Sequence, residues 1–172
     1  MKLAPIMFVV AVLGAPSPQT FPGGGHGIGF DDLGSAPMLR KVMVPGGGTG
    51  KLALIDPDSQ QTEIVGGFSE QTRYAGGHGE GITSANACRG LLYVTDRSAK
   101  LLDILDPRTK KIVASAQLAS GPDHVRFVPD TNEAWITEPG AERIEIFALP
   151  NEGVGAPTHT GLSRYQGSRS RS

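Results

Sequence analysis

The feature that most constrains this chain is an internal repeat. The dipeptide Asp56-Pro57 recurs 50 positions later as Asp106-Pro107, and the tetrapeptide Tyr-Val-Thr-Asp at 93–96 recurs 42 positions later as Trp-Ile-Thr-Glu at 135–138. A repeat of about 40–50 residues is one supersecondary unit, which cannot bury its apolar surface alone and must stack on its neighbours. The fold of this chain is therefore expected to be a row of similar units.

Each unit consists of short segments with strand composition, separated by turn residues. In the central unit the predicted strands are residues 80–84, 91–95, 100–105 and 111–117. In the first unit the second to fourth strands are predicted at 39–44, 51–55 and 61–65. In the third unit three strands are predicted at 124–128, 133–137 and 142–148, without a fourth. Four strands per unit is the pattern of a β-propeller.

We therefore predict an all-β fold, a β-propeller of four-stranded antiparallel blades with about three blades present, which makes an incomplete ring. The predicted blades cover residues 26–75 and 76–118, with a partial blade at 119–149. Asp56 and Asp106 are interpreted as turn residues, and Trp135 is interpreted as core between blades.

Both ends of the chain differ from the repeats in composition. Residues 1–15 combine Lys2, an apolar run at 3–13 and the small residues Gly14 and Ala15. This resembles a secretory signal peptide, and the run is shorter than the roughly 20 apolar residues that span a bilayer. The alternative is an apolar strand that helps to close a blade. Residues 16–25 are a Pro/Gly-rich lead-in.

Residues 150–172 turn to a low-complexity composition rich in Ser and Arg, which cannot bury a core. We predict a disordered or frameshifted tail there, as in a truncated gene. An open blade edge would then be exposed and could self-associate. The signal-like start at 1–15 predicts a secreted or periplasmic protein.

Composition excludes several classes of partner. The 16 Lys and Arg residues nearly balance the 17 Asp and Glu residues, so the chain has no electrostatic footprint for nucleic acid or anionic lipid. No later segment is long and apolar enough for a membrane span. The single Cys88 cannot form an internal disulfide, and the paired-Cys spacing of a zinc module is absent.

Short motifs mark the head and the strands of each unit. They are Gly-Gly-His-Gly at 76–79, Leu-Tyr-Val-Thr-Asp at 92–96, Leu-Asp-Ile-Leu-Asp at 102–106 and Gly-Pro-Asp-His-Val at 121–125. In this combination the chain resembles the bacterial YVTN-type β-propeller repeat, of the quinoprotein amine dehydrogenase-like propeller superfamily, over about residues 23–149. It departs at Asp96 and Glu138, where the repeat often has asparagine, and at Pro45 in the first unit. The resemblance implies a scaffold rather than an activity.

The glycine-rich segment 45–52 superficially resembles a phosphate-binding P-loop. Pro45 stands where that motif needs its first glycine, and Leu52 stands where it needs Ser or Thr. The segment also aligns with the connections between the second and third strands of the other units. We therefore expect a β-turn here and no nucleotide binding.

Histidines stand at the head of each unit, next to carboxylates that include Asp31 and Asp32. If adjacent blades project these groups from equivalent points on one rim of the channel, they can bind a ligand or move protons. The alternative is that turn residues were duplicated with the repeat. The predicted ligand-binding residues are His26, His78, Glu80, Asp123 and His124. We predict no metal site, because zinc needs each nitrogen at about 2.0–2.1 Å from one ion and groups on separate blades need not meet that geometry.

The chain contains no known motif for a catalytic nucleophile or metal. We therefore expect a non-catalytic binding scaffold for a protein or a small ligand, and the sequence names no cofactor. The alternative is an enzyme of the quinoprotein dehydrogenase-like or lactonase-like propeller type, with its site at the channel rim.

Overall fold

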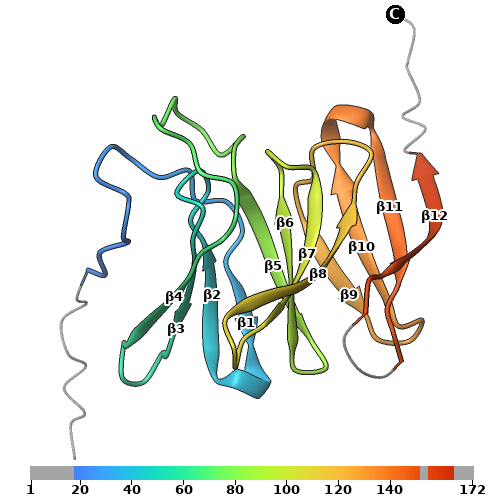
Figure 1. Ribbon diagram of the computed structural model, residues 1–172, viewed down its shortest axis with the longest axis horizontal. Helices are drawn as coiled ribbons and strands as arrows, with labels where there is room; N and C mark the ends of the chain where they lie inside the picture. The colour runs from blue at the N-terminus through green and yellow to red at the C-terminus, as the bar shows by residue number, and fades with distance from the viewer. Residues whose placement is uncertain (1–17, 152–154, 165–172) are drawn as a thin grey trace, which may run out of the picture.

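A computed structural model describes residues 18–151 and 155–164 of the chain (Figure 1). Within these residues the chain forms three four-stranded antiparallel sheets in succession. The first contains β1 (Gly34–Ala36), β2 (Lys41–Pro45), β3 (Leu52–Ile55) and β4 (Thr62–Val65). The second contains β5 (Ile82–Cys88), β6 (Leu91–Asp96), β7 (Leu101–Asp106) and β8 (Lys111–Gln117). The third contains β9 (Val125–Val128), β10 (Glu133–Glu138), β11 (Arg143–Ala148) and β12 (Thr158–Arg164).

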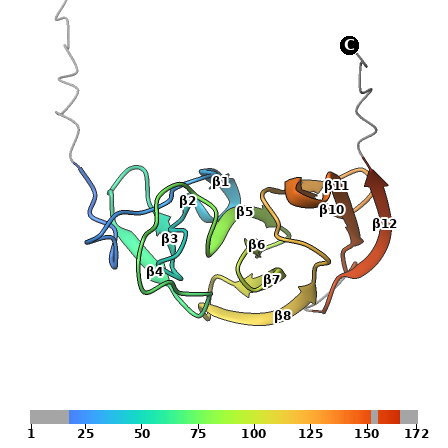
Figure 2. The same cartoon turned by 90° about the horizontal axis from the view of Figure 1, so that it is seen from above.

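Each sheet is one blade of a propeller, because its four strands pair in sequence order. The first strands of the blades lie together, since β5 contacts β1 and also β9. Seen from above, the blades fan out into an arc with β4, β8 and β12 on its outer edge (Figure 2). The prediction of an all-β propeller with part of a ring of four-stranded blades is confirmed.

Short 3-10 turns, η1 (Pro37–Leu39) and η2 (Pro139–Ala141), precede β2 and β11. Among the described residues no helix has the length and hydropathy needed to cross a membrane. The predicted signal peptide at 1–15 lies outside the described residues.

The third blade corrects the sequence prediction, which gave it no fourth strand and placed its end at 149. β12 supplies that strand and pairs with β11, from Ala148 opposite Thr158 to Arg143 opposite Arg164. Its sequence, Thr-His-Thr-Gly-Leu-Ser-Arg, lacks the apolar alternation that marks a half-buried strand. Backbone pairing with β11 defines this outer strand, so part of the predicted disordered or frameshifted tail at 150–172 is ordered β-structure.

Aspartate-proline turns connect the third and fourth strands of the first two blades. Asp56 Oδ1 accepts hydrogen bonds from the backbone N–H groups of Asp58 at 3.0 Å and Ser59 at 2.9 Å. Asp106 Oδ1 accepts the equivalent bond from Arg108 N–H at 2.9 Å. The interpretation of both aspartates as turn residues is confirmed.

The core lies between neighbouring blades. One apolar cluster joins the first blade to the second, and another joins the second to the third. Along β6 the side chains alternate, so that Leu92 and Val94 face the first blade and Tyr93 faces the third. Cys88 also lies in the second cluster, and burial raises the pKa of its thiol.

The interpretation of Trp135 as core is wrong. Its side chain is 37% exposed, and its indole N–H donates a hydrogen bond to Glu133 Oε2 at 3.0 Å. Ala134 and Ile136 face the second blade, so Trp135 between them points to the other face of β10. Tyr93 occupies the equivalent position in the second blade, where the third blade covers it. No blade formed by described residues covers that face of β10.

Asp96 and Glu138, two of the three positions that depart from the YVTN-type pattern, link consecutive blades. Asp96 Oδ2 accepts a hydrogen bond from Ser69 N–H at 2.7 Å, and Glu138 Oε1 accepts one from Ser120 N–H at 2.9 Å. Both serines lie in the connection that leaves the preceding blade. These buried carboxylates therefore hold the connection between blades in place.

Candidate functional site

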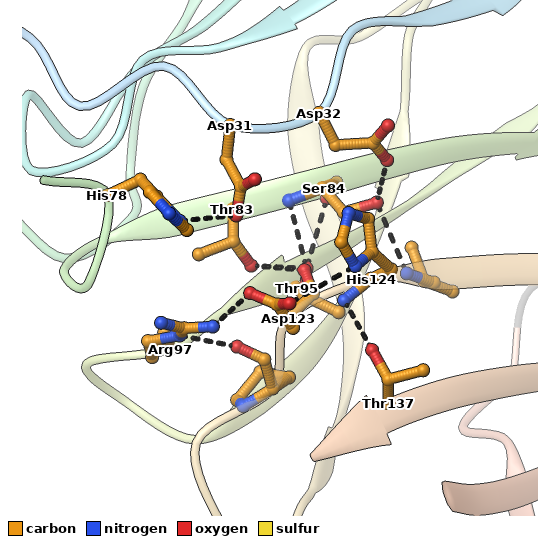
Figure 3. A network of polar contacts seen from close by, with 12 residues as sticks. Asp31, Asp32, His78, Thr83, Ser84, Thr95, Arg97, Asp123, His124 and Thr137 are labelled. Carbon is orange, nitrogen blue, oxygen red and sulfur yellow. Dashed lines mark hydrogen bonds and ion pairs between the residues drawn. The ribbon is translucent and has the colours of Figure 1, made fainter. Parts of the chain in front are cut away.

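A group of polar side chains lies where the first strands of the three blades approach one another (Figure 3). Asp31 and Asp32 precede β1, His78 precedes β5, and Asp123 and His124 precede β9 directly. Two arginines complete the group. We call these residues the rim cluster: Asp31, Asp32, His78, Arg97, Asp123, His124 and Arg126.

Threonine hydroxyls position the rim cluster. Thr83 at the start of β5 donates a hydrogen bond to the carbonyl of Asp123 at 2.6 Å, and its hydroxyl lies 3.0 Å from that of Thr95. Thr95 accepts the backbone N–H of Ser84 at 3.1 Å. Thr137, 42 positions after Thr95, accepts the backbone N–H of His124 at 2.9 Å. In the second and third blades, the repeated threonine near the end of the second strand thus fixes the start of the first strand of the same blade.

Asp32 is held in its charged form by two blades. Arg126 donates to Oδ2 at 2.7 Å and to Oδ1 at 3.1 Å, and Ser84 Oγ donates to Oδ2 at 2.6 Å. Burial by itself would raise the pKa of Asp32, but the hydrogen bonds from Arg126 and Ser84 outweigh it and hold the pKa below its ordinary value. The carboxylate is therefore ionised at neutral pH.

Asp123 divides its two carboxylate oxygens between different partners. The Arg97 guanidinium binds Oδ1, while Oδ2 lies 3.2 Å from Nδ1 of His124. Arg97 also donates through Nε to the carbonyl of Pro122 at 2.7 Å, which fixes its position. Asp31 differs, because its Oδ2 is buried and accepts no hydrogen bond from a described residue, although Nδ1 of His78 lies 3.1 Å away.

Next to the rim cluster is an open pocket, the glycine pocket, with a volume of about 70 Å³. One water needs roughly 10–15 Å³ of such space, so the pocket can hold a small molecule. Half of its lining residues are glycines, and the others include His26, Gln71, Arg73, Tyr74 and Glu80. Gly77 and Gly79 belong to the lining and flank His78 of the rim cluster.

Glycine is required at position 27 in the wall of the pocket. Gly27 has a φ of +106°, and a Cβ built there would lie 2.3 Å from the ring of Tyr74. The ring of Tyr74 therefore packs directly on the Gly27 backbone and forms one wall of the pocket.

The structure divides the predicted site residues into two groups. His78, Asp123 and His124 meet in the rim cluster, whereas His26 and Glu80 line the glycine pocket. The repeat suggested that the three histidines occupy equivalent positions, but in the structure they do not. His124 directly precedes β9, but residues 79–81 separate His78 from β5 and residues 27–33 separate His26 from β1. The strand predicted at 80–84 begins only at Ile82, as β5, so Glu80 lies in the loop before it.

Sequence reasoning missed Arg97 and Arg126, since neither belongs to the repeat motifs that it followed. The available signals were local. Arg97 directly follows Asp96, and Arg126 follows His124 by two residues, so both arginines lie close in sequence to residues of the repeat motifs.

The segment 45–52 forms the predicted turn between β2 and β3. Gly46 N–H donates to the Lys51 carbonyl at 2.9 Å, and Thr49 N–H donates to the Gly46 carbonyl at 3.1 Å. A Cβ built on Gly81 would lie 2.1 Å from the carbonyl oxygen of Gly47. The glycines here allow the backbone before β5 to lie against this turn, and this accounts for a motif that superficially resembles a P-loop.

Comparison with known proteins identifies the fold and nothing finer. No family model matches the chain, and no curated protein matches it. Among solved structures, a Lactobacillus plantarum protein aligns with a TM-score of 0.64 and 14% identity over 81% of this chain. The hydrazine synthase of Kuenenia stuttgartiensis aligns with a TM-score of 0.59 and 12% identity over 87%. The β-propeller domain of Cps50 from Myceliophteria thermophila aligns with a TM-score of 0.56 and 14% identity over 73%.

The chain covers 43%, 38% and 41% of the lengths of these three proteins. It therefore spans less than half of the length of each. At 12–14% identity the likeness shows a shared propeller fold, which hosts many unrelated functions.

Proposed function

We propose that this chain is a non-catalytic binding scaffold, an exported propeller of the YVTN type that holds a small polyhydroxylated ligand in the glycine pocket. The export proposal rests on the signal-like composition of residues 1–15. The YVTN proposal rests on the tetrapeptides at 93–96 and 135–138 and on the glycine-histidine turns.

The chemistry of the pocket lining carries the proposal. Glu80 offers a hydrogen-bond acceptor, Arg73 and the glycine N–H groups offer donors, and Tyr74 offers an aromatic ring. A polyhydroxylated molecule matches this mixture, because its hydroxyls both donate and accept and its C–H groups pack on aromatic rings. A stable protein partner needs about 800 Å² of each surface, whereas the pocket is a small hollow.

Calorimetric titration with glucose and with gluconate tests this proposal. We expect saturable binding of at least one probe, weakened about tenfold or more in Glu80→Gln, since a hydrogen bond to a charged group contributes about 1.5–3 kcal/mol. Glu142→Gln is the matched control, because Glu142 is an exposed glutamate outside the pocket lining. If neither probe bound, or if the two variants bound equally well, the small-ligand proposal would be wrong.

A further inference from the structure

We infer that Asp31, Asp123 and His124 form a binding site for a divalent cation of the first transition row. The candidate donor atoms of these three side chains all lie within 4.8 Å of one another. Ligand distances of about 2.0–2.6 Å place two donors of one ion at most about 5 Å apart. The three donors can therefore share one ion after small side-chain movements.

Asp31 supplies the most direct indication of a missing partner. Its Oδ2 is buried, and no described residue donates a hydrogen bond to it. The contact with His78 is an ion-pair distance of 3.1 Å to an imidazole whose side chain is 54% exposed, while that of Asp31 is 12% exposed. A buried carboxylate oxygen without a donor is unfavourable unless a cation or water satisfies it.

Asp123 and His124 present their donors as neighbouring ligands of one ion would. Two ligands at about 2.1 Å from an ion, at angles of about 90–110°, lie about 3.0–3.4 Å apart. The distance between Asp123 Oδ2 and His124 Nδ1 is 3.2 Å. Arg97 holds the other oxygen of Asp123, which is the outer-shell arrangement that orients a ligating carboxylate.

The charge of the rim cluster also favours a cation. Arg126 pairs with Asp32 and Arg97 pairs with Asp123, so Asp31 is the carboxylate left without a guanidinium partner among the described residues. With neutral imidazoles the cluster carries one negative charge. An imidazole nitrogen with two carboxylates is a donor set that suits Zn²⁺ or Mn²⁺.

This donor set differs from the one that the sequence suggested. The sequence predicts no zinc site formed by the three histidines at the heads of the units, and these histidines do not converge. The structure instead brings one carboxylate from the start of the first blade to the Asp-His pair of the third.

Calorimetric titration of the chelator-treated full chain with Zn²⁺ and with Mn²⁺ tests the inference. We expect one equivalent to bind, and Asp31→Asn and His124→Gln to weaken binding at least about tenfold, because loss of an outer-shell partner alone costs about 10–100-fold. Both variants leave the Asp32–Arg126 and Arg97–Asp123 pairs intact. His26→Ala is the control, since it removes an imidazole that lies in the glycine pocket.

Absence of saturable uptake of either ion would overturn the inference. So would metal binding by Asp31→Asn and His124→Gln, each shown to be folded by circular dichroism, with wild-type affinity. The result is separable from the proposed sugar site, because Glu80→Gln should lower sugar binding and leave metal affinity unchanged.

Discussion

Arg126 donates hydrogen bonds to both carboxylate oxygens of Asp32, at 2.7 and 3.1 Å, although the two residues are 94 positions apart in the sequence. Asp32 precedes the first blade and Arg126 belongs to β9 of the third. Ser84 of the second blade donates to the same carboxylate at 2.6 Å. Three blades therefore meet at one side chain, on the inner side of the arc.

Arg126→Ala should destabilise the chain by about 1–3 kcal/mol, since it leaves the largely buried Asp32 carboxylate without its cation. The loss of stability should lie near the lower end of this range, because the side chain of Arg126 is 53% exposed. Arg108→Ala removes an exposed arginine from Asp106 and should cost less than about 0.5 kcal/mol. Urea unfolding of both variants measures the difference. Equal costs would contradict a special role for the link between blades.

Ile104→Ala and Trp135→Ala should differ in cost. Ile104 is fully buried between the second and third blades, so its truncation should cost about 2–5 kcal/mol through lost burial and a residual cavity. Trp135 lies on the exposed face of β10, and its truncation should cost less than about 1 kcal/mol. Chemical denaturation checks this order. A larger loss for Trp135→Ala would mean that this face is covered.

Most of the fold could be predicted from the sequence, because local signals determine it. Short segments of strand composition between turn residues predicted β6 and β7 to within one residue, and the aspartate-proline turns predicted the hairpins that follow the third strands. β12 could not be predicted in this way. It is an outer strand with little apolar surface, so its pairing with β11 leaves no alternation in the sequence.

The site was predictable only in part. His78, Asp123 and His124 were identified from their positions in the repeat, and the structure brings them to the rim cluster. The partners that define their chemistry come from other blades, as Arg97 does for Asp123. Contacts of this kind depend on how blades stack, which a repeat in a single sequence does not specify.

Asp103→Asn should raise stability at neutral pH. Burial raises the pKa of Asp103 above its ordinary value of 3.8, the hydrogen bond from Ser115 opposes that rise, and the charge of Asp96 adds to it. A folded-state pKa above the unfolded value gives stability that is full below the unfolded pKa and is lost as pH rises through the folded pKa. The amide of asparagine avoids this loss and can still accept the Ser115 bond.

Urea unfolding at about pH 3 and about pH 7 measures this effect. The gain of Asp103→Asn over the wild type should be larger at the higher pH. Asp130→Asn, at an exposed aspartate, is the control and should show no comparable trend. If the stability gain of Asp103→Asn became smaller as the pH rose, the upward direction assigned to the pKa shift of Asp103 would be wrong.

Gly81→Ala should cost more than Gly90→Ala. Both glycines have a positive φ, +70° and +79°, so each alanine pays about 1–2 kcal/mol of backbone strain. A Cβ at Gly81 also meets the Gly47 carbonyl oxygen at 2.1 Å, whereas at Gly90 it meets no atom within 4 Å. Thermal unfolding should show the larger loss for Gly81→Ala. Equal losses would contradict the close contact between β5 and the β2–β3 turn.

The most direct test of the proposed function is to map ligand contacts by amide NMR during titration with glucose and with gluconate. We predict saturable shifts of the Gly27, Gly77 and Gly79 amides, which line the pocket, and little change at Gly90 and Gly140, which lie elsewhere. Shifts confined to other surfaces, or a spectrum unchanged at saturating concentrations of both probes, would contradict the account.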